Sequence, residues 1–119
     1  MTIDEAISIS AEECLSESDI DALCTDLKCS RPQAFDALAR EVAERYMSHR
    51  LDFETADAVM NDVWGHAMEL PDVPTFMYEV YEAFDAGEYE HAGDPSGIDT
   101  AEKYTRPALA RILTGRVQA

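Results

Sequence analysis

Acidic side chains and histidines are the residues of this chain that could do chemistry, and a metal site is the first possibility that they raise. His91, Asp94 and Asp99 fall within one short segment that is rich in glycine. A calcium loop of the EF-hand kind needs oxygen ligands at alternating positions, a glycine at its sixth position and a glutamate at its twelfth. Neither a loop that starts at Asp94 nor one that starts at Asp85 fits this pattern. The sequence therefore predicts no metal site and no cofactor.

Catalytic chemistry finds no better support in the spacing of the reactive residues. General acid–base catalysis needs a carboxylic acid whose pKa is shifted inside a pocket, but Glu79 and Glu82 lie about one turn apart on a helix face that we expect to be exposed. No serine or cysteine has the setting of an activated nucleophile, and no glycine-rich phosphate loop is present. The sequence predicts that this protein is not an enzyme.

The acidic residues are distributed unevenly, and this asymmetry is the main indication of function. Residues 51–102 contain fourteen Asp or Glu and no Lys or Arg, within a chain whose formal net charge is −16. Nucleic acid is disfavoured as a partner because its phosphates need positive charge. A basic protein or metal cations fit this charge, and solubility is an alternative reason for it.

A helix and the loop after it are expected to present these acids as one continuous negative patch. Tyr78 and Tyr89 fit the buried stripe of that region poorly, so we predict that they are exposed anchors for a basic partner. The alternative, that both tyrosines pack beneath the loop, remains open. The predicted partner-binding residues are Tyr78, Glu79, Glu82, Asp85, Glu88, Tyr89, Glu90, Asp94 and Asp99.

Apolar periodicity predicts an all-α fold of four main helices and one short helix, packed as a small bundle in a single domain over residues 1–119. The short helix is expected near residues 18–28, with Ser18 as its cap. The main helices are expected to begin at the capping box of Ser30 and Gln33, at Asp52, near Pro74, and near residue 100 or 105. Residues 1–16 are expected to be irregular or loosely docked, since Ile7 to Ser10 alternate like a lone strand.

The helix after Asp52 carries the clearest amphipathic pattern. Its apolar residues recur with the period of one helix face, and Pro71 ends the run. Trp64 and Met68 belong to this stripe, so we expect both in the core and no exposed apolar stripe for dimerisation. Gly87 is expected to end the following helix in the left-handed conformation. The apolar stripe of the Asp52 helix consists of Ala56, Val59, Met60, Val63, Trp64, Ala67 and Met68.

The cysteines and the apolar content bear on the cellular compartment. Cys14, Cys24 and Cys29 are odd in number and form no CxxC motif, so we expect ordinary thiols in a reducing cytoplasm. The first residues lack the basic start and apolar run of a secretory signal. No window reaches the roughly twenty apolar residues that span a bilayer. The prediction is a cytoplasmic protein that does not enter membranes.

Two segments resemble a known family. Residues 84–89 (FDAGEY), the acidic loop after them and a last helix through residues 109–113 resemble the second half of immunity proteins of the colicin D immunity type, and so do residues 46–54 (YMSHRLDFE). Separately, residues 90–99 are similar to a loop of the DNase-colicin immunity proteins. In that loop residues 92–94 are inserted here, and a single tyrosine, Tyr104, precedes Pro107 in place of a pair. The first resemblance extends over residues 40–114.

The resemblance implies an inhibitor of a bacterial toxin. Such proteins are small, acidic and helical, and they bind the basic catalytic domain of a nuclease, whose active site holds phosphates with Lys and Arg. Opposite charge would speed association, and aromatic anchors would slow dissociation. The alternative is a stand-alone cytoplasmic domain, regulatory or housekeeping, whose acidity serves solubility. The sequence leaves the partner and the oligomeric state undetermined.

Overall fold

Helices account for all the regular structure in residues 1–115, which are the residues that this computed structural model describes. In chain order they are α1 (Ile3–Glu13), α2 (Glu17–Leu27), α3 (Arg31–Met47), α4 (Phe53–Ala67), α5 (Thr75–Ala86), the π-helix η1 (Ala101–Thr105) and α6 (Arg106–Thr114). The predicted all-α class is confirmed, with six α-helices in this range in place of the five expected. None of these helices is long and apolar enough to cross a membrane.

Side-chain caps fix where most of these helices begin. The Ser30 hydroxyl accepts from the Gln33 N–H, and the Gln33 side chain accepts from the Ser30 N–H, which confirms the predicted capping box of α3. Asp52 caps α4 as predicted, through the Thr55 N–H at 2.8 Å. The cap of α2 is Ser16, so the prediction of Ser18 was wrong.

Residues 1–16 are largely helical, and the prediction of an irregular, loosely docked segment was wrong. Thr2 and Glu5 form a capping box at the start of α1. Ala6, Ile7 and Ser10 are buried on one face of the helix. Ser10 is polar, so its buried position interrupts the apolar pattern that would predict a helix. The remaining isoleucines alternate like those of a strand.

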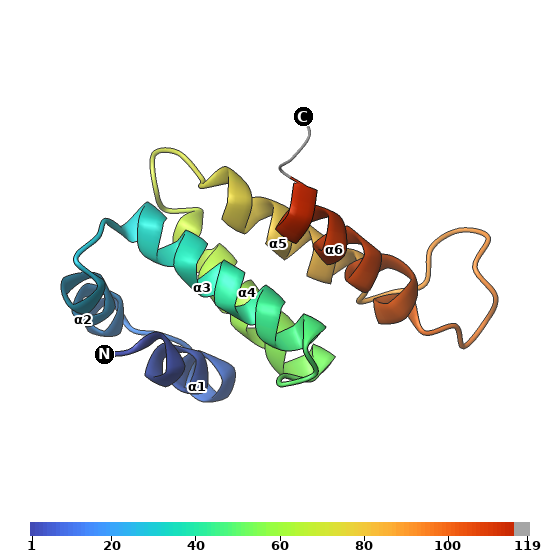
Figure 1. Ribbon diagram of the computed structural model, residues 1–119, viewed down its shortest axis with the longest axis horizontal. Helices are drawn as coiled ribbons and strands as arrows, with labels where there is room; N and C mark the ends of the chain where they lie inside the picture. Colours follow the sequence, from blue (N-terminus) through green and yellow to red (C-terminus); the bar gives the residue numbers. More distant parts are fainter. Residues whose placement is uncertain (116–119) are drawn as a thin grey trace.

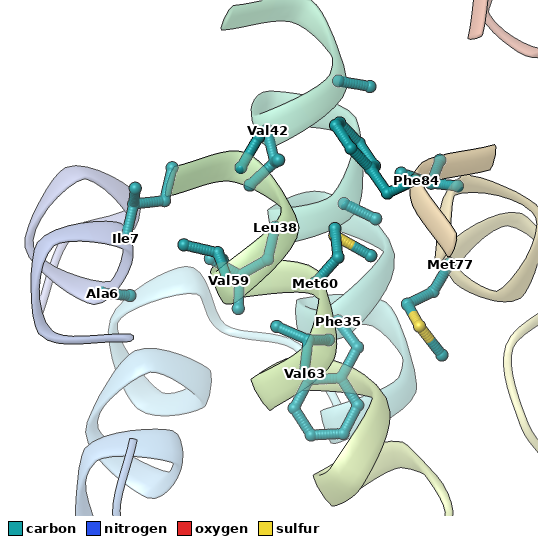
Figure 2. Close-up of a cluster of buried hydrophobic side chains, with 14 of the residues drawn as sticks. Ala6, Ile7, Phe35, Leu38, Val42, Val59, Met60, Val63, Met77 and Phe84 are labelled. Carbon is teal, nitrogen blue, oxygen red and sulfur yellow. The ribbon is translucent and has the colours of Figure 1, made fainter. Parts of the chain in front are cut away.

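The central helices are α3 and α4, with α1 and α2 packed on one side of them and α5, η1 and α6 on the other (Figure 1). Because α4 contacts α1, α3 and α5, three of its sides meet other helices. Most of the predicted apolar stripe of α4 is buried between these neighbours. Figure 2 shows the core side chains converging from four helices, among them Ile7, Leu38, Val42, Val59, Met60, Val63, Met77 and Phe84.

The end of α5 is shaped by a close approach to η1. Gly87 has a φ of −86°, so the predicted left-handed cap was wrong. A β-carbon at this position would lie 2.0 Å from Oγ1 of Thr105 and 3.2 Å from the backbone of Ala101. The buried Thr105 hydroxyl also donates to the Ala83 carbonyl at 2.8 Å. Glycine is therefore required here because of the space it leaves, and this contact fixes the direction in which the chain leaves α5.

Candidate functional site

The predicted binding residues lie on α5 and on the loop that joins α5 to η1, but in different surroundings. Tyr78 lies on the side of α5 that faces α4, where its ring is near Trp64. Its hydroxyl donates a 2.7 Å hydrogen bond to Glu82, which lines a hollow toward α6 together with Glu79 and Arg111. Glu79 lies beside Arg111 of α6, where both line a hollow between the two helices. Tyr78 therefore faces α4, whereas Glu79 and Glu82 lie toward α6.

Asp57 of α4 joins the acids at the end of α5, and the sequence did not place it among the binding residues. Burial and the nearby carboxylates of Glu88 and Asp85 raise the pKa of Asp57 to about 7. Asn61, one turn along α4, reaches both sides of the cluster: its amide nitrogen lies 3.4 Å from Asp57 Oδ2 and 3.3 Å from Glu88 Oε2. Asp57, Asp85 and Glu88 together are called the acidic cluster below.

No cation of the described chain neutralises the acidic cluster. Within residues 1–115, no lysine or arginine forms an ion pair with Asp57, Asp85 or Glu88. The amide of Asn61 is a neutral donor, and it is shared between two carboxylates. Carboxylates that crowd together without a cation repel one another, and this repulsion adds to burial in raising the pKa of Asp57.

Aromatic side chains continue the same seam between α4 and α5. The rings of Trp64 and Tyr81 stack with centroids 4.7 Å apart and planes 15° apart, and Tyr78 lies 5.3 Å from Trp64. Burial, then the charges of Asp85, Glu88 and Asp57, raise the pKa of Tyr81. Tyr81 and Asp85 lie one turn apart on α5, so the tyrosine borders the acidic cluster. Trp64, Tyr78 and Tyr81 are called the aromatic shelf below.

The aromatic shelf is accessible, so two expectations about α4 were wrong. Trp64 is half-buried at the edge of the core, where we expected it to be inside, and Met68 is 57% exposed. Tyr78 is 37% exposed, as predicted for an anchor, and Val73 is exposed beside it. A hollow of about 340 Å³ opens here, lined by Trp64, Val73, Thr75 and Tyr78. An exposed apolar patch is therefore present where none was expected.

The loop after α5 uses much of its charge to hold itself in place. Asp94 is the clearest case, since its side chain is only 2% exposed and it accepts hydrogen bonds from Lys103, the His91 N–H and the Tyr104 hydroxyl. These donors, Lys103 foremost, lower the pKa of Asp94 to about 2. Asp94 was predicted to face a partner, but it is enclosed by its own loop because the charge of Lys103 draws it inward.

The other acids of this loop remain exposed and still make local contacts. Glu90 accepts from the Gly97 N–H at 2.7 Å, and Asp99 accepts from the Glu102 N–H at the start of η1. Tyr89 is 53% exposed and stacks on His91 at 4.5 Å. Neither Tyr78 nor Tyr89 is covered by the loop, so the alternative that both pack beneath it was wrong.

A second polar cluster lies where α1 turns into α2, and it is enclosed. Asp62 of α4 accepts from the Ser10 hydroxyl at 2.7 Å and from the Leu15 N–H at 2.9 Å. His66, one turn further, places Nε2 2.9 Å from the Leu15 carbonyl oxygen. Asp62 lies outside the apolar stripe of its helix, but its side chain is 7% exposed because α1 covers it. We call these contacts the corner clamp.

Cys14 borders the corner clamp and resembles a nucleophile in its setting, since it is exposed and close to Asp62 and His66. The negative charge of Asp62, then burial, raises the pKa of the Cys14 thiol. An activated cysteine needs the opposite shift, because the thiolate is the reactive form. Cys14 also adopts a φ of +72° at the end of α1. These features describe a turn that the clamp holds in place.

Metal binding receives no geometric support in the described residues, where no three His, Cys, Asp or Glu side chains are grouped so as to hold an ion. The acidic cluster contains three carboxylates, but Asn61 contacts two of them through its amide nitrogen, which is a donor. The aromatic shelf and the acidic cluster lie side by side along α4 and α5 and are candidate binding features.

No protein-family model, curated protein or solved structure matches this chain. The resemblance to immunity proteins therefore stays a prediction that rests on the sequence segments that carry it.

Proposed function

We propose that this protein is a binding module that docks the seam between α4 and α5 onto a basic protein, and that it acts without catalysis as an inhibitor of the immunity type. The partner in this proposal is the catalytic domain of a nuclease toxin, whose phosphate-binding site carries Lys and Arg. The proposed interface comprises the acidic cluster, the aromatic shelf and Glu82. Compared with the residues expected from sequence, it adds Asp57, Trp64 and Tyr81 and omits Glu79, Tyr89, Glu90, Asp94 and Asp99.

The observation that carries the proposal is the juxtaposition of partly exposed aromatic side chains with carboxylates that no Lys or Arg of residues 1–115 neutralises. Interface hot spots are rich in Trp and Tyr, which bury large areas at small cost in entropy. Charge that is crowded in the free protein is relieved when cations of a partner approach. The repulsion between these carboxylates in the free protein therefore favours the binding of a cationic partner.

The chemistry of the partner follows from this surface. A site that holds phosphates must present several Lys or Arg side chains close together, and a row of carboxylates matches such a site in charge. Attraction between opposite charges speeds association, and the rate falls as salt screens it. An inhibitor that must act before its toxin cleaves nucleic acid benefits from a fast encounter.

The compartment is part of the same proposal. All three cysteines are free thiols, and Cys14 is exposed. Free thiols persist in reducing compartments. We place the protein in the cytoplasm, where a nuclease would reach the nucleic acid of the cell.

A capture experiment with matched baits tests the proposal. The wild-type protein, a Glu82→Lys/Glu88→Lys variant and a Glu12→Lys/Glu13→Lys variant are immobilised, exposed to lysate of the source organism at low salt, and eluted with a salt gradient. The two variants have the same net charge, but the second pair of substitutions lies on α1. We expect one basic protein to bind the wild-type and α1 variants and to be lost from the seam variant.

The identity of the captured protein completes the test. The proposal predicts nuclease activity in that protein, which the wild-type chain inhibits and the seam variant inhibits at least tenfold less. A mixture of many basic proteins that elutes at low salt, equally from all three baits, would contradict it. That result would favour the alternative in which acidity only keeps a helical domain soluble.

A further inference from the structure

We infer that the hollow beside Trp64 is the docking point for an arginine side chain of the basic partner. The hollow is lined by Trp64, Val73, Thr75 and Tyr78, and its volume of about 340 Å³ lies at the lower end of the range for ligand pockets. It can take one long side chain. This inference rests on the proposed function, because it names the group by which the partner is held.

The walls of the hollow suit a planar cation. Trp64 and Tyr78 contribute aromatic rings whose centroids are 5.3 Å apart. A guanidinium group that lies against the face of such a ring is attracted by its quadrupole, and tryptophan is the strongest partner for this contact. The chain already packs arginine in this way, since Cζ of Arg106 lies 4.7 Å from the centre of the Tyr46 ring.

A carboxylate lies next to one wall of the hollow, at Glu82, although this residue lines a separate hollow toward α6. The Tyr78 hydroxyl donates to Glu82 Oε2 at 2.7 Å, so the ring that forms the wall also holds the acid in place. A carboxylate has lone pairs for further donors. The forked N–H groups of arginine match a carboxylate in two parallel hydrogen bonds, whereas the ammonium of lysine is a compact point charge. The combination of ring and carboxylate therefore favours arginine over lysine.

Charge complementarity selects a protein with exposed arginines as the occupant. The acidic cluster extends the negative surface from Glu82 along α5, with the charges of Asp85 and Glu88 acting on Tyr81. A second copy of this chain would bring an equally acidic surface, because its formal net charge is −16. Repulsion between the two copies opposes self-association through this face.

Trp64 is the single tryptophan of the chain, so its fluorescence reports on the hollow without a label. The test is a titration of the full-length protein with two capped peptides of equal charge, hexa-arginine and hexa-lysine, at about 0.1 M salt, where the screening length is about 10 Å. We expect hexa-arginine to change the Trp64 emission and to bind at least about threefold more tightly than hexa-lysine.

Variants at the hollow separate the aromatic contact from general attraction. Tyr78→Leu removes the ring, and we expect hexa-arginine to bind about two- to fivefold more weakly and its preference over hexa-lysine to be lost. Tyr78→Phe keeps the ring and retains most of the preference. We expect Glu82→Gln to weaken the binding of hexa-arginine more than Glu12→Gln does. The second substitution is the control, since it removes one exposed charge from α1. Val73→Lys places a like charge at the rim and abolishes the preference without touching the ring.

Equal affinities for the two peptides, or a Tyr78→Leu variant that binds hexa-arginine like the wild type, would overturn the inference. Circular dichroism checks that each variant is folded. The capture experiment with the Glu82→Lys/Glu88→Lys variant is independent of these titrations. A partner that is lost from that variant while both peptides bind equally would refute the arginine pocket and leave the proposed function standing.

Discussion

Asp57 and Asp62 lie on the same helix and have opposite surroundings. Asp62 faces α1, where the Ser10 hydroxyl and the Leu15 N–H donate hydrogen bonds to it. Asp57 faces α5, where burial and the carboxylates of Glu88 and Asp85 raise its pKa to about 7. Asp62 accepts hydrogen bonds from two donors, whereas Asp57 faces two further carboxylates and has only the shared, 3.4 Å contact with the Asn61 amide, although the two residues are five positions apart in the sequence.

This difference distinguishes acids that hold the fold together from acids that oppose it. Hydrogen bonds to a buried carboxylate stabilise the contact between α4 and the α1–α2 turn. Crowded carboxylates destabilise the contact between α4 and α5. Local arrangements that work against stability occur at functional sites, where a ligand supplies what the chain lacks. The comparison therefore supports the seam between α4 and α5 as the binding face and the corner clamp as structural.

We expect the largest loss of stability from a substitution in the corner clamp. Asp62→Ala leaves the Leu15 N–H and the Ser10 hydroxyl without their acceptor, and we expect a loss of about 3 kcal/mol in the free energy of unfolding. Urea denaturation at pH 7 measures it, with Glu12→Ala on α1 as the control for removal of an exposed acid. A loss below about 1 kcal/mol would mean that Asp62 is no more structural than a surface acid.

We expect the next largest loss of stability from a substitution at the junction of α5 and η1. Gly87→Ala brings a β-carbon against Oγ1 of Thr105, and we expect a loss of about 2 kcal/mol in stability from overpacking. Gly65→Ala is a matched control, because a β-carbon there meets no atom within 4 Å and alanine favours the helix. If both substitutions have the same effect, the close approach that positions Glu88 is not present in solution.

A substitution of Asp57 is expected to have a smaller effect, and to raise the stability of the protein. The pKa of Asp57 is raised in the folded state, so its ionisation opposes folding progressively as pH rises from about 4 to about 7, and the full penalty remains above pH 7. We expect Asp57→Asn to stabilise the protein by about 1 kcal/mol at pH 8, a value reduced for solvent screening, and to have little effect at pH 4. Denaturation curves at the two pH values check this, and a gain that is equal at both would contradict it.

The smallest expected effect is a pH dependence of binding that arises from the proton on Asp57. A cationic ligand at the acidic cluster lowers the pKa of Asp57, so a proton is released on binding and affinity rises with pH. We expect the affinity for hexa-arginine to rise about two- to threefold between pH 6 and pH 8 in the wild type and to stay constant in Asp57→Asn. Equal pH dependence in both proteins would show that Asp57 does not take part.

The sequence allowed correct predictions at some local patterns, although the equally local capping boxes of Thr2 with Glu5 and of Ser16 with Asp19 were missed. The capping box of Ser30 and the cap at Asp52 were predicted correctly because they depend on a few adjacent residues. Helix α1 was missed because Ser10 is buried by its contact with Asp62, which is 52 residues away. The local signal that could have found α1 is the capping box of Thr2 and Glu5.

The candidate site was predicted in part, for the same reason. Tyr78 and the acids of α5 follow from the period of their own helix. The roles of Asp57 and Trp64 cannot be predicted in this way. Their surroundings depend on which side of α4 packs against α5 and on how much of that side α5 covers. Asp94 was assigned to the surface because its charge is visible in the sequence, whereas its pairing with Lys103 is a property of the folded loop.

The most direct test of the central claim is the association rate of the captured partner with the wild type and with the two double-charge variants at low salt. If the seam between α4 and α5 is the interface, Glu82→Lys/Glu88→Lys slows association at least tenfold and Glu12→Lys/Glu13→Lys less than twofold, because attraction depends on where the charge lies. Equal slowing by both variants would mean that only net charge matters, and the seam would then not be the binding face.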